Sequence, residues 1–193
     1  MQSICVFCGS NPGASPAYAE AARDLGRRIA GRGLRLVYGG AKVGLMGALA
    51  DATLAAGGQV IGVMPVALVE KEIAHAGLTE LHTVGSMHER KAMMADRSDA
   101  FLGLPGGAGT LEEVFEVWTW GQLGHHRKPV GLLNVAGFYD GLIEFVAKMG
   151  EVGFLRPQHQ GILLTDQDLD RLLAKMADFE PTVPIIRMTR EDL

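Results

Sequence analysis

Ala100-Phe-Leu-Gly-Leu-Pro-Gly-Gly-Ala-Gly-Thr110 joins an apolar run to a glycine-rich turn, a junction that indicates the fold class. Its first half, residues 100–104, has the continuous apolar character of a parallel β-strand that is covered on both faces. Its second half leads into a helix predicted over residues 111–123, with a core stripe at Leu111, Val114, Phe115 and Trp118. A strand that passes through a glycine turn into a helix predicts one βα unit of a parallel sheet.

The same alternation of short apolar runs and longer helical patterns continues in both directions. Strands are predicted at residues 4–8, 35–38, 60–64, 80–84, 100–104, 130–134 and 161–164. Helices are predicted near residues 16–32, 43–57, 87–97, 111–123, 138–151 and 168–178. We therefore expect an α/β fold: a doubly wound, Rossmann-like parallel sheet of about seven strands with helices on both faces, in a single domain over residues 1–193.

Composition and charge exclude several other classes of protein. Hydrophobic residues make up 48 % of the 193-residue chain, which excludes a disordered polymer. The formal net charge of −4 gives no general attraction to nucleic acid or anionic membranes. No apolar run reaches the roughly 20 residues of a membrane-spanning helix. Only two cysteines, and an N-terminus without a basic leader, favour a cytoplasmic protein that does not depend on disulfides.

Three glycine-rich turns follow predicted strands, at residues 8–13, 38–44 and 104–110. Ligands of such sheets bind beyond the carboxyl ends of the strands, so these turns predict the binding site. In the third turn, glycines leave backbone N–H groups open at the start of a helix, an arrangement that suits a phosphate group. The turn lacks the Gly-Lys-Ser/Thr of a Walker A loop, and the first turn lacks the Gly-x-Gly-x-x-Gly spacing of dinucleotide sites. Triphosphate hydrolysis and NAD binding are therefore disfavoured.

Two acidic residues follow the predicted phosphate loop directly. Glu112 and Glu113 lie in the first turn of the predicted helix. A carboxylate at Glu113 could activate a water molecule or stabilise a developing oxocarbenium ion. The spacing Thr110-x-x-Glu113 is also that of a capping box, in which the glutamate only satisfies a backbone N–H group. The sequence leaves both interpretations open.

Two cations occur in the preceding helix. Arg90 and Lys91 share a helical face with Met87, from which they could reach a substrate anion. The alternative is that both side chains extend into solvent. Because their helix and the helix of Glu113 follow strands that are consecutive in the sequence, we expect Arg90 and Glu113 to face one cleft.

Other polar residues predict neither a metal nor a redox site. Cys5 and Cys8 form C-x-x-C within one predicted strand, where residues three apart point to opposite faces. The six histidines show no metal-ligand spacing. Trp120 lies outside the core stripe of its helix, which predicts either a wall on which a base stacks or a subunit interface.

Together these motifs resemble the Lonely Guy (LOG) family of cytokinin riboside 5'-monophosphate phosphoribohydrolases, formerly described as lysine decarboxylases. Pro105-Gly-Gly-Ala-Gly-Thr-Leu-Glu-Glu113 matches the family signature PGGxGTxxE, and Met87-His-Glu-Arg-Lys91 is a second matching motif. The resemblance covers nearly the whole chain. It implies a Rossmann-like homodimer that hydrolyses the N-glycosidic bond of N6-substituted AMP to a free base and ribose 5-phosphate. Bacterial members of the family are also expected to cleave plain AMP.

The resemblance further implies roles for individual residues. Arg90 and Glu113 would be catalytic. The nucleotide would contact Gly9, Ser10, Gly40, Glu72, Met87, Lys91, Gly107, Ala108, Gly109, Thr110, Leu111, Glu112 and Thr119. Ala108 stands where plant members often have tyrosine, which leaves the preference for the base or its substituent open. The resemblance implies no cofactor and no metal, and we identify no pyridoxal phosphate site, which decarboxylation would need.

The alternative is a non-enzymatic nucleotide-binding or carrier protein that uses the same cleft and catalyses no reaction. Rossmann-like proteins also resemble carriers of nucleotide-like cofactors, and a fold does not determine an activity. Incubation with AMP distinguishes the two, because an enzyme releases adenine and a carrier retains the nucleotide.

Overall fold

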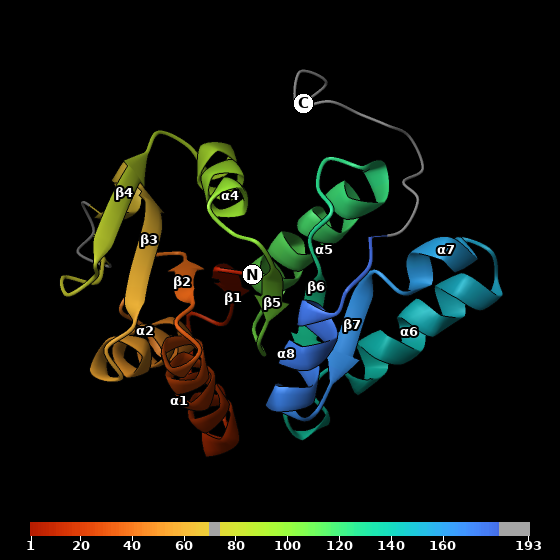
Figure 1. Cartoon of the computed structure of the whole chain (residues 1–193), viewed down its shortest axis with the longest axis horizontal. Helices are drawn as coiled ribbons and strands as arrows, with labels where there is room; N and C mark the ends of the chain where they lie inside the picture. The colour runs from red at the N-terminus through yellow and green to blue at the C-terminus, as the bar shows by residue number, and fades with distance from the viewer. Residues whose placement is uncertain (70–73, 182–193) are drawn as a thin grey trace.

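The computed structural model describes residues 1–69 and 74–181, and a seven-stranded sheet crosses its centre (Figure 1). The strands are β1 (Ser3–Phe7), β2 (Arg35–Tyr38), β3 (Gln59–Pro65), β4 (Glu80–Val84), β5 (Phe101–Gly103), β6 (Val130–Leu133) and β7 (Leu163–Asp166). They lie in the order β4-β3-β2-β1-β5-β6-β7, and each pair of neighbours is parallel. The predicted α/β fold with a parallel sheet is confirmed.

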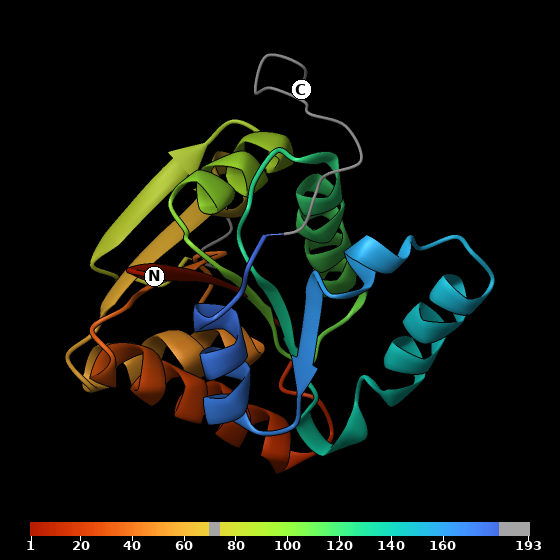
Figure 2. The ribbon, with the colours of Figure 1, turned by 45° about the vertical axis from the view of Figure 1, so that its right-hand side comes forward.

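Helices cover both faces of the sheet (Figures 1 and 2). One face is covered by α1 (Pro16–Gly31), α2 (Gly44–Ala55) and α8 (Leu169–Ala177). The other face is covered by α4 (Met87–Asp96), α5 (Ala108–Leu123) and α6 (Asp140–Glu151), and the short helix α7 (Pro157–Gln160) contacts α6. The short helices α3 (Val66–Val69) and η1 (Val135–Gly137) follow β3 and β6. Within the described ranges, none of these helices combines the length and the apolar character that a bilayer crossing requires.

The central strand β1 is buried along its whole length, because each face lies under a layer of helices. Cys5 belongs to the core on the side of α4 and α5, whereas Cys8 belongs to the core on the side of α1 and α2. Both thiols are free. The prediction that these cysteines point to opposite faces is confirmed, and the two thiols do not form a pair.

Most predicted boundaries are correct to within two residues, and the differences have local causes. The strand predicted at 161–164 begins at Leu163, because the preceding residues form α7, which Gly161 ends. The helix predicted at 111–123 begins earlier, at Ala108. The short helices α3, η1 and α7 were not predicted, since four or fewer residues carry no helical periodicity.

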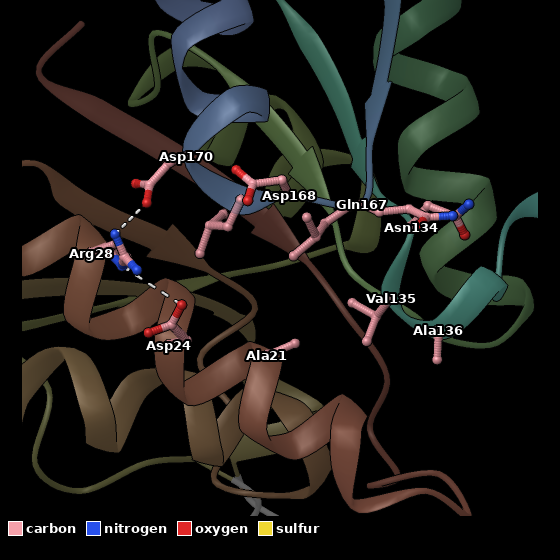
Figure 3. Close-up of a pocket in the computed structure, with 11 residues that line it drawn as sticks. Ala21, Asp24, Arg28, Asn134, Val135, Ala136, Gln167, Asp168 and Asp170 are labelled. Atoms are coloured by element: carbon pink, nitrogen blue, oxygen red, sulfur yellow. Dashed lines mark hydrogen bonds and ion pairs between the residues drawn. The ribbon is translucent and has the colours of Figure 1, made fainter.

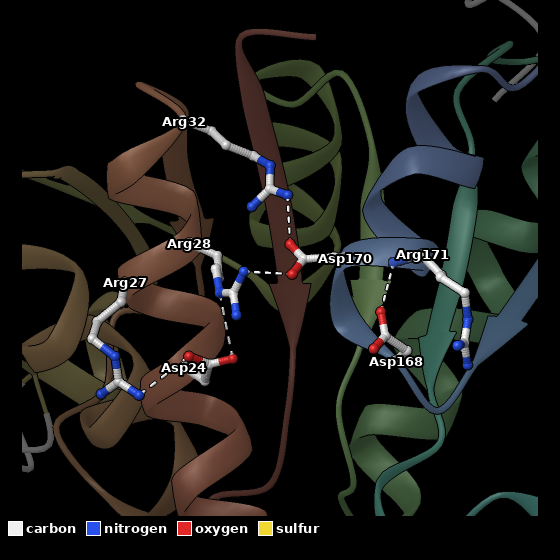
Figure 4. Close-up of polar contacts among 7 residues, drawn as sticks. All are labelled: Asp24, Arg27, Arg28, Arg32, Asp168, Asp170 and Arg171. Atoms are coloured by element: carbon white, nitrogen blue, oxygen red, sulfur yellow. Dashed lines mark hydrogen bonds and ion pairs between the residues drawn. The ribbon is translucent and has the colours of Figure 1, made fainter.

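A group of exposed ion pairs connects α1 to α8 (Figure 4). Asp170, in the first turn of α8, accepts hydrogen bonds from Arg28 of α1 and from Arg32, the residue that caps the C-terminus of α1. Arg28 also lies 3.6 Å from Asp24, one turn earlier in its own helix. These contacts join α1 to α8 on one face of the sheet.

The strand order places a topological switch point at the centre of the sheet. From β1, the chain proceeds through β2 and β3 to β4 at one edge, returns to β5 beside β1, and then proceeds to β7 at the other edge. The turns after β1 and β5 therefore leave the sheet in opposite directions. A crevice between such turns is where open α/β sheets bind their ligands.

Candidate functional site

A cavity of about 260 Å³ occupies the switch point. Its floor joins the turns after β1 and β5, because Gly9 N–H donates to the Pro105 carbonyl oxygen at 3.1 Å. The start of α2 is attached to the same floor, since Leu45 N–H donates to the Gly9 carbonyl oxygen at 3.0 Å. The cavity is lined by Gly9, Ser10, Asn11, Pro12, Gly13, Tyr18, Leu45, Pro105, Gly106, Gly107 and Phe138.

The N-terminus of α5 opens beside this cavity without a side-chain cap. Gly107 is the N-cap residue, in an extended conformation with φ −87° and ψ −161°, and no side chain accepts from the first turn. Residues 107–109 are exposed, so their N–H groups and the positive end of the helix dipole are open to an anion. Thr110 is only 5 % exposed and lies directly under Gly106, where an added Cβ would overlap its hydroxyl oxygen.

The capping-box interpretation of Thr110 and Glu113 is wrong. Because α5 begins at Ala108, Thr110 lies inside the helix and not at the cap position. Glu113 is therefore beyond the reach of the N-cap backbone, and its carboxylate is available for another partner.

That partner is Arg90. Arg90 Nη1 lies 3.4 Å from Glu113 Oε1, and the side chains are only 11 % and 13 % exposed. The distance is longer than an ordinary N–H···O hydrogen bond, so the two groups form an ion pair without a close bond between them. The two side chains, which the sequence predicts to face one cleft, thus lie against each other.

A capped helix start fixes the position of Arg90 on α4. Ser86 Oγ accepts from Glu89 N–H at 3.1 Å, and Glu89 Oε2 accepts from Gly85 N–H at 2.7 Å. The first bond satisfies an N–H group of the first turn, and the second satisfies the N–H group of the residue before the N-cap. Arg90 and Lys91 follow directly in the same helix.

The guanidinium of Arg90 is held on three sides and does not extend into solvent. Its Nε donates to the Val63 carbonyl oxygen at 3.1 Å, and its Nη1 lies 3.9 Å from Met87 Sδ. Gly39 completes the enclosure, because a Cβ at that position would overlap Arg90 Nη2. The glycine after β2 is thus needed for the close approach of the guanidinium to the backbone.

Burial raises the pKa of the Glu113 carboxyl above its usual 4.5. The neighbouring Arg90 opposes this rise in pKa, and Glu112 adds to it. A buried carboxylate with a raised pKa is a stronger base than an exposed one. The pair therefore combines a proton acceptor with a fixed cation, next to an open helix N-terminus.

Lys91 is also buried, but it contacts two carboxylates of α5. Its Nζ lies 2.6 Å from Glu112 Oε1 and 2.9 Å from Glu116 Oε1, and its side chain is 9 % exposed. Burial lowers the pKa of Lys91, but the hydrogen bonds to the two carboxylates more than compensate and leave it raised. Glu116 was not among the predicted site residues, although Glu112 and Glu116 are four residues apart and therefore share one face of the helix.

Comparison with known proteins identifies the family. Residues 46–176 match the model of a family described as "Possible lysine decarboxylase". The chain is 51 % identical to a probable cytokinin riboside 5'-monophosphate phosphoribohydrolase of Oryza sativa subsp. japonica, over 92 % of this chain and 78 % of that protein. The chain belongs to the LOG family. A cytokinin riboside 5'-monophosphate phosphoribohydrolase of Arabidopsis thaliana is 48 % identical, over 92 % of this chain and 82 % of that protein.

A solved structure shares the fold of this LOG family member at lower identity. The molybdenum cofactor carrier protein MCP from Chlamydomonas reinhardtii superposes with a TM-score of 0.67 and is 24 % identical. The alignment covers 90 % of this chain and 98 % of that protein. It supports the Rossmann-like architecture.

The other residues that the LOG resemblance singles out do not all lie together. Gly9, Ser10 and Gly107 line the switch-point cavity. Ala108, Gly109, Thr110 and Leu111 form the first turn of α5, whereas Thr119 is exposed further along that helix. Gly40, whose carbonyl oxygen accepts from His75 N–H, follows Gly39. Glu72 lies outside the described residues, and Trp120 is half-buried against the core.

A second cavity, of about 370 Å³, lies away from these LOG residues (Figure 3). It is bounded by α1, the turn after β6 and the start of α8, and the ion pairs of Asp170 form part of its wall. Across residues 1–69 and 74–181, no three His, Cys, Asp or Glu side chains are grouped as a metal ion would require. The predicted site is therefore the switch-point cavity together with the Arg90–Glu113 pair.

Proposed function

We propose that this LOG family member hydrolyses the N-glycosidic bond of adenosine 5'-monophosphate or of an N6-substituted form of it. The products are the free base and ribose 5-phosphate. The observation that carries the proposal is the buried pair of Arg90 and Glu113, 3.4 Å apart, beside the uncapped N-terminus of α5. Relatives at about half identity bear names of phosphoribohydrolases, not of decarboxylases, which supports this reaction for the family.

The phosphate group of the substrate binds at the start of α5. Open N–H groups of residues 107–109 and the helix dipole provide the attraction, and the absence of a side-chain cap leaves the space. Glu113 follows about one and a half helical turns later, which is roughly 8 Å along the axis. A ribose 5-phosphate extends over a similar reach, so an anchored phosphate brings its anomeric carbon near Glu113.

Glu113 is the proposed general base. Water supplies an oxygen to C1', the bond from C1' to the base nitrogen breaks, and the base departs with the electron pair and takes up a proton from solvent. The carboxylate accepts the proton of the attacking water and offsets the positive charge that develops at C1'. Arg90 orients the ribose and keeps Glu113 ionised enough to act.

Release of base from AMP tests the proposal. Wild-type protein is incubated with AMP and with N6-isopentenyl-AMP, and free base is measured by chromatography. We expect Glu113→Gln to lower turnover about 10²–10⁴-fold while AMP binding is retained. Adenosine, which lacks the phosphate, loses turnover as well as affinity. Folded Glu113→Gln protein with wild-type turnover would disprove the role of this carboxylate.

The same assay tests the non-catalytic alternative. Wild-type protein that retains AMP and releases no base would be a carrier. The homodimer, the cytoplasmic location and the absence of nucleic-acid binding stay predictions of this proposal. Light scattering after size-exclusion chromatography measures the first of them.

A further inference from the structure

The contacts of Lys91 form a cross-link between the two helices that carry the proposed catalytic residues. Lys91 directly follows Arg90 on α4, and its partners Glu112 and Glu116 flank Glu113 on α5. Both Nζ···Oε1 distances, 2.6 and 2.9 Å, lie within hydrogen-bonding range. The buried ammonium therefore ties α4 to α5 at the level of the Arg90–Glu113 pair.

This cross-link matters because the pair does not hold itself together. At 3.4 Å, Arg90 Nη1 and Glu113 Oε1 are too far apart for a close hydrogen bond. On its other side, Arg90 is bonded to the Val63 carbonyl oxygen of β3. The gap between guanidinium and carboxylate is therefore set by the spacing of the two helices.

The two carboxylates that bind Lys91 are not equivalent. The side chain of Glu112 is 56 % exposed, whereas that of Glu116 is 23 % exposed. An exposed ion pair is weakened by solvent. Glu116 Oε2 is buried, and among the described residues it has no hydrogen-bond partner. A carboxylate oxygen without a partner is costly to bury, and the bond from Oε1 to Lys91 compensates for that cost.

We propose that Glu116, through Lys91, is a positioning residue of the proposed reaction: it holds α4 against α5 so that Arg90 and Glu113 keep a reactive separation. The inference rests on the proposed function and deepens it. Lys91, to which the family resemblance assigns a substrate contact, then serves mainly to fix the spacing of α4 and α5.

Charges near Glu113 give this role a signature that simple stabilisation would not produce. Burial raises the pKa of Glu113, Arg90 and Lys91 of α4 lower it, and Glu112 and Glu116 of its own helix raise it. The thiols of Cys5 on β1 and of Cys8 just after it are also near enough to interact electrostatically with this carboxylate, but burial raises their pKa values and they stay neutral. Removing Glu116 and removing Lys91 therefore move the pKa of Glu113 in opposite directions.

Glu116→Gln tests the proposal, because glutamine keeps the shape and removes the charge. We expect kcat for adenine release from AMP to fall about tenfold to hundredfold, with a smaller change in KM, as a displaced catalytic pair requires. The acidic limb of the pH–rate profile moves to lower pH. In Lys91→Met the same limb moves to higher pH, and Lys91→Arg restores most of kcat.

The control is Glu151→Gln, which removes the partner of Lys148 from an exposed pair on α6. Its kcat and pH profile are expected to match the wild type. The double variant Lys91→Met with Glu116→Gln is expected to lose no more turnover than Lys91→Met alone, because the two residues act as one unit. Additive losses would contradict the cross-link.

A readout without turnover separates the two proposals. Carbon NMR of the Glu113 carboxyl reports its titration in wild type, Glu116→Gln and Lys91→Met, whether or not AMP is hydrolysed. If wild-type protein releases no adenine but the two variants shift this titration in opposite directions, the proposed function fails and the electrostatic arrangement stands. If neither the titration nor kcat changes in folded Glu116→Gln protein, Glu116 is not a positioning residue. If that variant does not fold, Lys91→Met and Lys91→Arg carry the same comparison.

Discussion

Arg90 and Glu113 meet although their helices follow strands that are far apart in the sheet. Arg90 lies on α4, which follows the edge strand β4, and Glu113 lies on α5, which follows the inner strand β5. Helix α4 returns across β3, where Arg90 Nε bonds to the Val63 carbonyl oxygen, and so approaches α5. The pair therefore depends on a crossover between distant strands.

Catalytic activity should depend on pH through Glu113. Burial raises the pKa of this carboxyl above 4.5, and the general base must be ionised to act. We expect kcat/KM for AMP to rise with pH through a midpoint above that of an ordinary glutamate. Initial rates of adenine release in buffers of constant ionic strength measure the midpoint. A midpoint at or below 4.5 would contradict the raised pKa.

The same carboxyl should cost the protein stability at neutral pH. Because its pKa is higher in the folded than in the unfolded chain, the folded state binds more protons between the two values, and stability falls as pH rises through them. Glu113→Gln removes this cost, so we expect its Tm to exceed the wild-type Tm by a few degrees at pH 7. The difference should shrink when the pH is lowered far enough to protonate the carboxyl. Thermal unfolding at a series of pH values checks both statements.

Gly39→Ala should disable the site and spare the fold. The added methyl group would overlap Arg90 Nη2, the mobile end of a long side chain, so the guanidinium moves and the backbone does not have to. We expect a loss of about tenfold to hundredfold in kcat with an unchanged circular dichroism spectrum. Gly31→Ala at the end of α1 is the matched control, because nothing lies within 4 Å of the added carbon. Equal activity of the two variants would refute the prediction.

The ion pairs between α1 and α8 should contribute little to stability and nothing to activity. Asp170→Ala removes the partner of Arg28 and Arg32, but all three side chains are more than a third exposed. Exposed pairs contribute little and are screened by salt. We expect Tm to fall by a few degrees at most, less at high ionic strength, with wild-type adenine release. Since hydrogen bonding by Arg32 lowers the pKa of Asp170, the difference should disappear in acid as this carboxyl is protonated.

The strands were predictable because their burial on both faces requires apolar runs, which the sequence displays. The start of α5 was not predictable, because its N-cap is Gly107, which has no side chain to mark it. Thr110 has the residue type of an N-cap and therefore suggested a later start. This shift of one turn decided the interpretation of Glu113. A glutamate that caps its helix and one whose carboxylate contacts another group have the same sequence pattern. Only the residue at which the helix begins distinguishes them.

Within the site, the sequence predicted that Arg90 and Glu113 face one cleft, but it did not predict that Lys91 pairs with carboxylates of α5. A lysine beside an expected ligand suggests a substrate contact, whereas the packing of α4 on α5 directs it to Glu112 and Glu116. The enclosure of Arg90 by Gly39 was also hidden, because it depends on a contact between segments about fifty residues apart in the sequence.

The switch point between β1 and β5 has a consequence for folding. The segments from β1 through α4 contribute the guanidinium of Arg90 and the glycine beside it, and the segments from β5 onward contribute the carboxylate of Glu113 and the open N-terminus of α5. Neither half of the chain alone contains a complete binding surface. A nucleotide bound at the switch point stabilises only molecules in which both halves are folded together. It would therefore protect backbone amides throughout the central strands from hydrogen exchange, and not only the amides that contact it.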